Sequence, residues 1–143
     1  MTLRHIAGLG MAIGVAGVTG AVHAEVSCPD QLNVQQRAQP PSGWSVTYAE
    51  QSPRLSGVTI FDGPPAHRGS LKFDRQRRTS KELILVWHLG YSPRSHYLLC
   101  RYDRTTAQIS IALPPGSRLC EVVFDLTDPG PGGVLPVKRM VCK

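Results

Sequence analysis

The sequence lacks the local patterns that mark common enzymes and metal proteins. It has no Gly-x-Ser-x-Gly turn of the kind that presents a hydrolase nucleophile. The glycine-rich stretch 130–133 is not followed by the Lys and Ser or Thr of a phosphate-binding loop. No two cysteines are spaced as Cys-x-x-Cys, the pair found in many zinc sites. We therefore predict that the protein is not an enzyme and that it has no cofactor and no bound metal.

Residues for acid–base chemistry are also few and scattered. Beyond residue 24 the only histidines are His67, His88 and His96. His88 lies within an apolar run, where a core imidazole is the simplest interpretation, and the other two lie beside predicted loops. Aspartates fall at predicted strand ends and turns, where Asp caps the backbone: Asp62, Asp74, Asp103 and Asp125. No pair of carboxylates is set across a predicted cleft, as glycoside hydrolysis would require.

Only one long apolar run is present, and it lies at the N-terminus. Residues 6–22 are rich in Ala, Gly and Val, follow Arg4, and end at Ala21-Val22-His23-Ala24. A basic start, an apolar run and a small-x-small site are typical of a secretory signal peptide. We predict a removed signal over 1–24, with a membrane anchor as the alternative, and no transmembrane segment thereafter. The remaining chain is expected to be periplasmic or secreted, so nucleic acid is not an expected partner.

The four cysteines all lie after the predicted signal. An even number of cysteines in an exported chain predicts two disulfides. Three pairings are possible. We favour Cys28–Cys100, which would tie the N-terminus to the core, and Cys120–Cys142, which would tie the last strand to its neighbour.

Positive charge is in excess. One of the 16 Lys and Arg residues, Arg4, lies in the predicted signal, so 15 stand against 10 Asp and Glu, a net charge of about +5. Basic residues concentrate in one segment: Arg68, Lys72, Arg75, Arg77, Arg78 and Lys81. Such a segment is either a solvated strand edge that resists edge-to-edge pairing or a docking surface for an anionic envelope component or an acidic protein.

Strand patterns dominate residues 25–143, and no capped amphipathic helix is evident. Turn signals recur roughly every 8 to 12 residues, which is typical of an all-β sandwich or barrel. We predict a single domain over 25–143, a small antiparallel β-sandwich or barrel built around residues 96–125, with a bulge at Ser56-Gly57. The expected strands are 32–38, 44–49, 53–63, 71–73, 82–89, 97–102, 107–113, 118–125 and 135–142.

Two stiffened loops are candidate binding elements. Asp62-Gly63-Pro64-Pro65 follows a predicted strand, and Tyr91-Ser92-Pro93-Arg94 places an aromatic residue and an arginine on a proline-containing loop. Tyr and Arg are enriched at interface hot spots, and a rigid loop loses little entropy on binding. The alternative for both loops is that the prolines merely end strands. The candidate binding residues are Asp62, Gly63, Pro64, Pro65, Tyr91, Arg94, Arg75, Arg77 and Arg78.

Several short motifs follow one another along the chain and together form a recognisable pattern. They are Cys28-Pro29, Leu32-x-Val34, Pro41-x-Gly43-Trp44, Leu55-x-Gly57-Val58, Phe61-Asp62-Gly63-Pro64-Pro65, Trp87, Tyr97-Leu98-x-Cys100-x-Tyr102, Leu113-Pro114, Cys120 and Cys142. This pattern resembles a family of small exported proteobacterial proteins of unknown function, named after an enterobacterial locus tag. The resemblance implies a periplasmic, disulfide-bonded domain and brings no activity, cofactor or site.

The function hypothesis follows from a small stapled scaffold with stiff loops and no catalytic pattern. We expect an exported binding protein that acts as a periplasmic inhibitor or immunity protein. Its expected target is a cell-wall-active enzyme, either a lysozyme or an effector delivered by a competitor, blocked by a loop. The alternative is an envelope accessory domain that binds an anionic glycan or lipid, or a larger assembly, through the basic face.

Overall fold

The computed structural model describes residues 25–35, 37–48 and 52–143. The predicted signal peptide over 1–24 therefore lies outside the described residues. Within the described residues, no helix is both long and apolar enough to cross a membrane.

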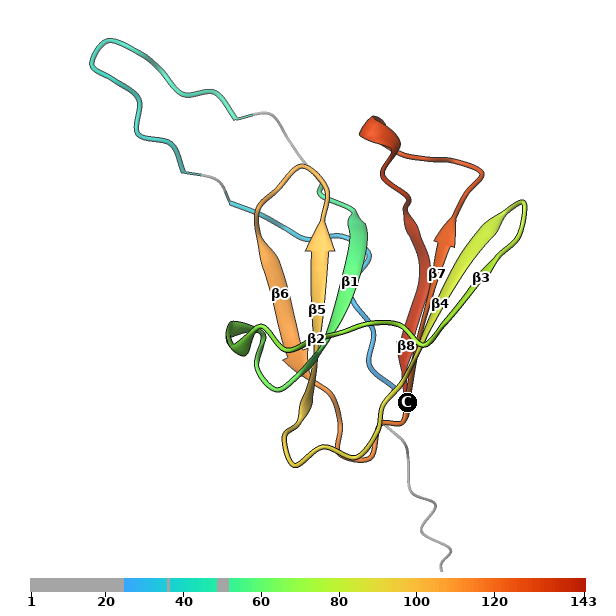
Figure 1. Ribbon diagram of the computed structural model, residues 1–143. Helices are drawn as coiled ribbons and strands as arrows, with labels where there is room; N and C mark the ends of the chain where they lie inside the picture. Colours follow the sequence, from blue (N-terminus) through green and yellow to red (C-terminus); the bar gives the residue numbers. More distant parts are fainter. Residues whose placement is uncertain (1–24, 36, 49–51) are drawn as a thin grey trace, which may run out of the picture.

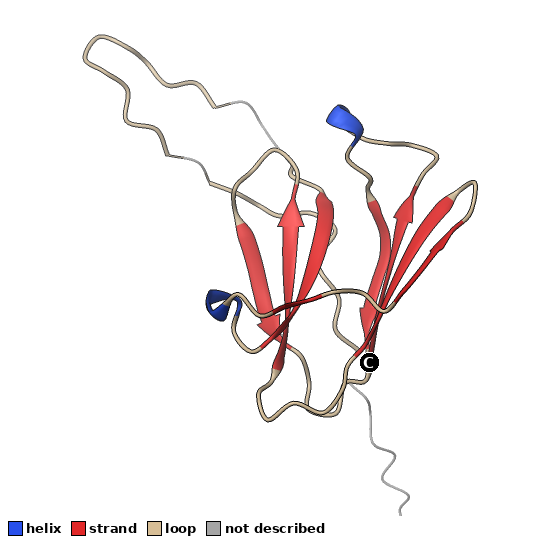
Figure 2. Ribbon diagram, viewed as in Figure 1, coloured by secondary structure: helices blue, strands red, loops and turns tan. Residues whose placement is uncertain are grey.

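Two antiparallel four-stranded sheets form the body of the protein (Figures 1 and 2). The first sheet has the order β2-β1-β5-β6 and the second has the order β3-β4-β7-β8. The strands of the first are β1 (Leu55–Asp62), β2 (Ser70–Leu71), β5 (His96–Tyr102) and β6 (Gln108–Ala112). Those of the second are β3 (Arg75–Arg78), β4 (Glu82–His88), β7 (Leu119–Asp125) and β8 (Val137–Cys142). The all-β prediction is confirmed, and of the two forms offered it is the sandwich.

The chain crosses between the sheets three times, after β2, β4 and β6. Two 3-10 turns, η1 (Pro65–His67) and η2 (Pro131–Gly133), complete the described elements. The predicted 96–125 unit is therefore split: β5 and β6 pair as a hairpin, whereas β7 belongs to the other sheet.

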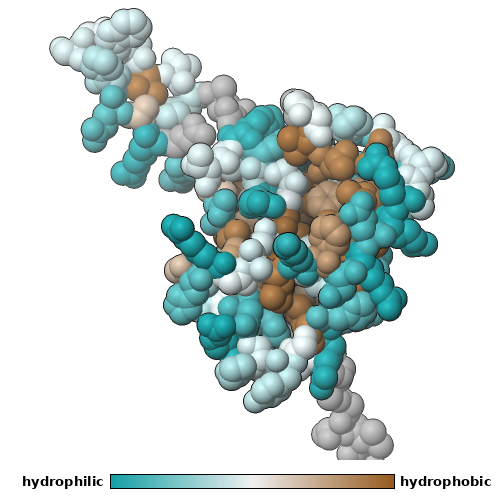
Figure 3. Space-filling model, viewed as in Figure 1, coloured by the Kyte–Doolittle hydropathy of each residue, from teal (hydrophilic) through white to brown (hydrophobic). Residues whose placement is uncertain are grey.

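The core lies between the facing sides of the sheets. Alternate residues of each strand point inward, and Ile60 and Leu98 of the first sheet and Val122 of the second are fully buried. Trp87 is 4% exposed and stacks edge-on against Phe73, with ring centroids 6.1 Å apart. Figure 3 shows a mostly hydrophilic face on which apolar side chains gather along the opening between the two sheets.

One disulfide ties the N-terminal segment to the first sheet, and a second joins two strands within the second sheet. Cys28 is bonded to Cys100 on β5, and Cys120 on β7 is bonded to Cys142 on β8. Cys120 and Cys142 are direct cross-strand partners. The pairing favoured from the sequence is the one present in the structure.

The first two predicted strands are wrong within the described residues. Residues 32–35 and 37–38 of the first, and 44–48 of the second, belong to no strand; positions 36 and 49 lie outside the described residues. The neighbourhood of Leu32 pairs with the body only through the isolated bridge between Gln31 and Arg54. Alternating apolar and polar residues led to the prediction of strands here, but the described residues of these segments pair with no neighbouring strand.

The strand β3 was missed for the opposite reason. Its four residues, Arg-Gln-Arg-Arg, are all exposed and carry no apolar pattern. Pairing with β4 creates the strand, and Thr79 closes the hairpin by accepting a hydrogen bond of 2.9 Å from the Glu82 amide. Of the predicted strand 71–73 only Leu71 lies in a strand, the two-residue β2, and residues 72 and 73 belong to none. The bulge at Ser56-Gly57 is confirmed by a register shift between Leu55 and Gly57.

Candidate functional site

The two candidate loops predicted from the sequence are brought together by the fold. Asp62 ends β1, and the loop 91–94 connects β4 to β5, which pairs with β1. The Gly63 amide donates a hydrogen bond of 3.1 Å to the Ser95 carbonyl. Asp62, the last residue of β1, pairs with His96, the first residue of β5. The two loops therefore lie side by side at the same end of the first sheet. We call residues 62–65 and 91–94 together the loop cluster.

Side-chain bonds to Asp62 hold the loop cluster. The Arg94 guanidinium donates to Asp62 Oδ2 at 2.9 Å, and the Ser92 hydroxyl donates to Asp62 Oδ1 at 2.5 Å. The Arg94 amide in turn donates to Ser92 Oγ at 3.1 Å. These bonds, that from Ser92 first and that from Arg94 second, hold the pKa of Asp62 below its ordinary value. Asp62 is therefore a charged anchor for both loops.

The backbone of the first loop is also fixed. Gly63 has φ +89°, a left-handed conformation that favours glycine. Pro65 begins η1, and the Arg68 amide closes that turn with a hydrogen bond of 3.0 Å to the Pro65 carbonyl. The Asp62 amide donates to the Gly69 carbonyl at 2.8 Å, which returns the chain to β2. The loop is thus closed at its base and stiffened by its prolines.

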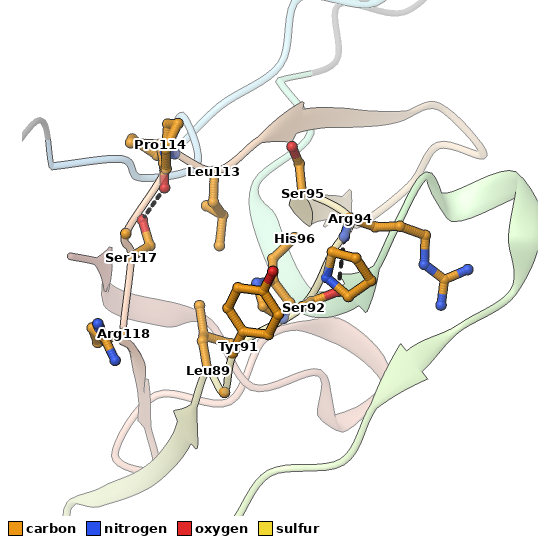
Figure 4. Close-up of a pocket in the computed structure, with 14 residues that line it drawn as sticks. Leu89, Tyr91, Ser92, Arg94, Ser95, His96, Leu113, Pro114, Ser117 and Arg118 are labelled. Atoms are coloured by element: carbon orange, nitrogen blue, oxygen red, sulfur yellow. Dashed lines mark hydrogen bonds between the residues drawn. The ribbon is translucent and has the colours of Figure 1, made fainter.

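A pocket of about 350 Å³ adjoins the second loop (Figure 4). In this view Tyr91 and Ser92 stand on one side, and Leu113, Pro114 and Ser117 on the other. The Arg94 side chain points away from the pocket, toward Asp62. Tyr91 is 97% exposed, so its ring is presented to solvent with little contact from the body.

The predicted basic residues lie elsewhere. Arg75, Arg77 and Arg78 are exposed on β3, the edge strand of the second sheet. Leu85 and Trp87 face the core, so Ile84 and Val86 face outward, opposite Arg77 and Arg75 in the ladder. Ile84 is nevertheless 7% exposed, and these four residues line one open pocket with Glu121. Long arginine stems therefore help to cover an apolar strip.

The histidines are not arranged as a recognisable catalytic group. His88 is exposed at the end of β4, contrary to the core position expected from its apolar surroundings. Its Nδ1 lies 3.5 Å from Asp74 Oδ2, with about half of each side chain accessible. His67 lies in η1 and His96 beside the pocket of Figure 4. Among the described residues, no group of three His, Cys, Asp or Glu is placed to hold a metal ion.

Two features escaped the sequence analysis. Ser92 joins the two loops through its bond to Asp62. The signal in the sequence is its position two residues before Arg94, because a serine hydroxyl can accept a hydrogen bond from the backbone amide two residues later. The segment 37–48 presents Trp44, Val46 and Tyr48 to solvent, and its alternating pattern was interpreted as a strand.

Comparison with known proteins assigns the chain to a family. A curated relative from Azospirillum brasilense, an uncharacterised 16.3 kDa protein in the trpG 5′ region, is 33% identical over 109 residues, covering 71% of this chain and 73% of that protein. No solved structure matches the chain. The model of the type VI secretion system Tli immunity protein family matches residues 49–143, which include all eight strands and the loop cluster. This assignment is more specific than the resemblance to a family of unknown function, and the chain belongs to the Tli immunity protein family of the type VI secretion system.

Proposed function

We propose that the protein is a periplasmic immunity protein that binds a toxic enzyme acting on the cell envelope and keeps it inactive. The observation that carries the proposal is the match to an immunity family over the residues that build the two sheets. An immunity protein acts by binding a partner protein, so no catalytic group is required of it.

The loop cluster is the surface that we assign to this partner. Asp62 fixes the two loops through Ser92 and Arg94, so little conformational entropy remains to be lost on binding. Tyr91 supplies an aromatic ring that is 97% exposed, and Tyr is one of the residue types enriched at interface hot spots. A rigid edge that carries one exposed aromatic side chain is suited to entering a cleft in the partner.

Two further observations support a periplasmic location. Four cysteines form two disulfides, and such bonds persist in oxidising compartments such as the periplasm. The N-terminal residues carry the predicted secretory signal. A competitor's toxin that acts on the cell wall would be met in the same compartment.

The immunity role predicts a toxin gene next to the gene for this protein, and the test uses the effector that such a gene encodes. Oxidised mature protein, residues 25–143, is titrated into the purified effector, and both binding and residual enzyme activity are measured. We expect a 1:1 complex and loss of activity. Tyr91→Ala is expected to weaken binding about ten-fold or more, equivalent to about 1.4 kcal/mol. Arg78→Glu, on the exposed edge of the other sheet, serves as the matched control and is expected to change affinity less than three-fold.

Two results would contradict this proposal. The immunity role fails if the wild-type protein neither binds nor inhibits the effector. The loop-cluster assignment fails if Tyr91→Ala, folded as judged by circular dichroism, binds as tightly as wild type.

A second candidate function rests on the exposed arginines of β3. Arg75, Arg77 and Arg78 present positive charge along a free sheet edge, which favours anionic lipid or glycan. Vesicles containing anionic phospholipid would then pellet the protein at low salt and release it as salt rises. The triple reversal of these arginines to Glu would abolish that binding, whereas an unchanged pellet fraction would exclude this role.

A further inference from the structure

A projecting segment lies outside both sheets. Residues 37–48, which we call the arm, extend away from the body as the teal loop in Figure 1. Described residues that precede and follow the arm are bonded to each other. Gln31 and Arg54 form a β-bridge, and the Leu32 amide donates a hydrogen bond of 3.1 Å to the Pro53 carbonyl.

The arm has an unusual composition for an exposed segment. Trp44, Val46 and Tyr48 are 74%, 36% and 55% exposed, and Arg37 is the arm's only charged residue. Exposed loops in a monomer are usually polar, whereas interface cores are depleted of charge and enriched in Trp and Tyr. The composition therefore indicates a surface that is covered by another molecule.

Local bonds give the arm a defined shape. The Trp44 amide donates to the Pro41 carbonyl at 3.1 Å, and Gly43 supplies the positive φ of +85° that this turn needs. The Ala38 amide donates to the Tyr48 hydroxyl at 2.9 Å, which holds the two sides of the arm together. Trp44 is consequently presented beside a closed turn rather than on a free chain.

The junction between the arm and the body forms an open pocket of about 680 Å³. Tyr48 and Arg37 line it from the arm, and Arg104 and Thr105 line it from the turn between β5 and β6. Arg37 and Arg104 bring positive charge to this pocket, and that of Arg104 is partly offset by Asp103, whose Oδ2 lies 3.5 Å from Arg104 Nε. A partner that fills this pocket is expected to bring acidic side chains.

We propose that the arm is a second contact for the toxic enzyme, with Trp44 inserted into an apolar pocket of that enzyme and acidic side chains of the enzyme beside Arg37. A second copy of this chain fits less well, because each copy carries a net charge of about +5 and two such pockets would bring like charges together. The arm lies outside residues 49–143, so it would add a contact beyond the part of the chain that the family model matches. This inference rests on the proposed function.

Affinity of the purified neighbouring effector for Trp44→Ala tests the arm directly. Titration calorimetry is expected to show a loss of about 30-fold, equivalent to the 2 kcal/mol of an interface hot spot. Ile111→Ala is the matched control, because Ile111 is 51% exposed on β6 and is not part of the arm. The control should bind within two-fold of wild type.

The outcomes separate the two proposals. Binding of Trp44→Ala within two-fold of wild type would overturn the arm contact and leave the immunity role standing. Failure of the wild type to bind would overturn the immunity role and the arm contact with it. A wild-type dimer that dissociates on Trp44→Ala, with effector affinity unchanged, would overturn the effector as the occupant in favour of a second copy.

A spectroscopic measurement covers the case in which a variant is altered in structure. The chain contains two tryptophans, Trp44 and the buried Trp87, so 5-fluorotryptophan gives two ¹⁹F resonances that Trp44→Phe assigns. Unlabelled effector should shift the Trp44 resonance and leave that of Trp87 in place. An unmoved Trp44 resonance in a formed complex would contradict the proposal.

Discussion

Arg94 donates a hydrogen bond of 2.9 Å to Asp62, and this ion pair joins the end of β1 to the loop before β5. Both side chains remain partly accessible, so the pair adds little to global stability. Its consequence is geometric, because a charge-assisted bond fixes the direction of the two loops relative to each other. The loop cluster should therefore be sensitive to any change in the charge or position of Asp62.

The charge of Asp62 can be tested by pH. Its folded-state pKa is lowered below the ordinary value of 3.8 by the bonds from Ser92 and then Arg94. The stability from ionised Asp62 is therefore fully present above about pH 4 and is lost as pH falls through the lower folded-state pKa. Urea unfolding of wild type and Asp62→Asn should show a small difference that is constant above pH 5 and shrinks toward pH 2. A difference independent of pH would contradict this role.

The position of Asp62 depends on Gly69. A Cβ at Gly69 would lie 2.9 Å from the Asp62 carbonyl oxygen, a backbone atom that cannot turn aside. Gly69→Ala should therefore displace the end of β1 and destabilise the protein by about 1–3 kcal/mol, the usual cost of overpacking. It should also weaken effector binding through the loop cluster.

Gly90→Ala provides the matched control for this substitution. A Cβ at Gly90 meets no atom within 4 Å, and its φ is not positive. Its free energy of unfolding should stay equal or rise by about 0.4–1 kcal/mol. Equal destabilisation by the two substitutions, measured by urea unfolding, would show that the contact with Asp62 is not the cause.

The sequence predicts the strands that carry an apolar pattern, the mostly exposed β6 among them, and misses β3, which carries none. β4 and β7 carry dense apolar runs, and their predicted positions agree closely with the structure. β3 has no apolar residue and becomes a strand only because β4 offers a partner. The arm shows the reverse error, since Trp44, Val46 and Tyr48 alternate as in a strand but have no core to cover.

Side-chain pairing across the candidate site was beyond sequence reasoning. Asp62 and Arg94 are 32 positions apart, and only the antiparallel pairing of β1 with β5 brings them together. Both had been proposed separately, as parts of two loops. The disulfides were more tractable, because four cysteines allow three pairings and the chain ends favour one of them.

The two disulfides should differ in their contribution to stability. Cys28–Cys100 spans a sequence separation of 72, and Cys120–Cys142 spans 22. In the chain-entropy description these closures are worth about 4.4 and about 3.4 kcal/mol. Cys28→Ala with Cys100→Ala should therefore lower the free energy of unfolding more than Cys120→Ala with Cys142→Ala, as measured by urea unfolding. The opposite order would indicate that the Cys120–Cys142 bond also stabilises the folded state directly, beyond its effect on the entropy of the unfolded chain.

Tyr102 holds the N-terminal segment beside the first disulfide. It is 5% exposed, and its hydroxyl donates a hydrogen bond of 2.9 Å to the Pro29 carbonyl. Tyr102→Phe removes this bond while keeping the ring, so it should cost about 0.5–1.5 kcal/mol at neutral pH. Burial, with a smaller effect of the Asp30 charge, raises the pKa of Tyr102 above 10.0.

A raised tyrosine pKa gives this position a characteristic alkaline response. The protonated phenol is favoured in the folded state, so its stabilising contribution is fully present below about pH 10 and is lost as pH rises through the folded-state pKa. The advantage of wild type over Tyr102→Phe in urea unfolding should therefore be constant from pH 7 to 9 and decline above pH 10. An advantage that persists unchanged at pH 11 would show that folding does not raise the pKa of Tyr102, and would contradict the burial of its phenol against Pro29.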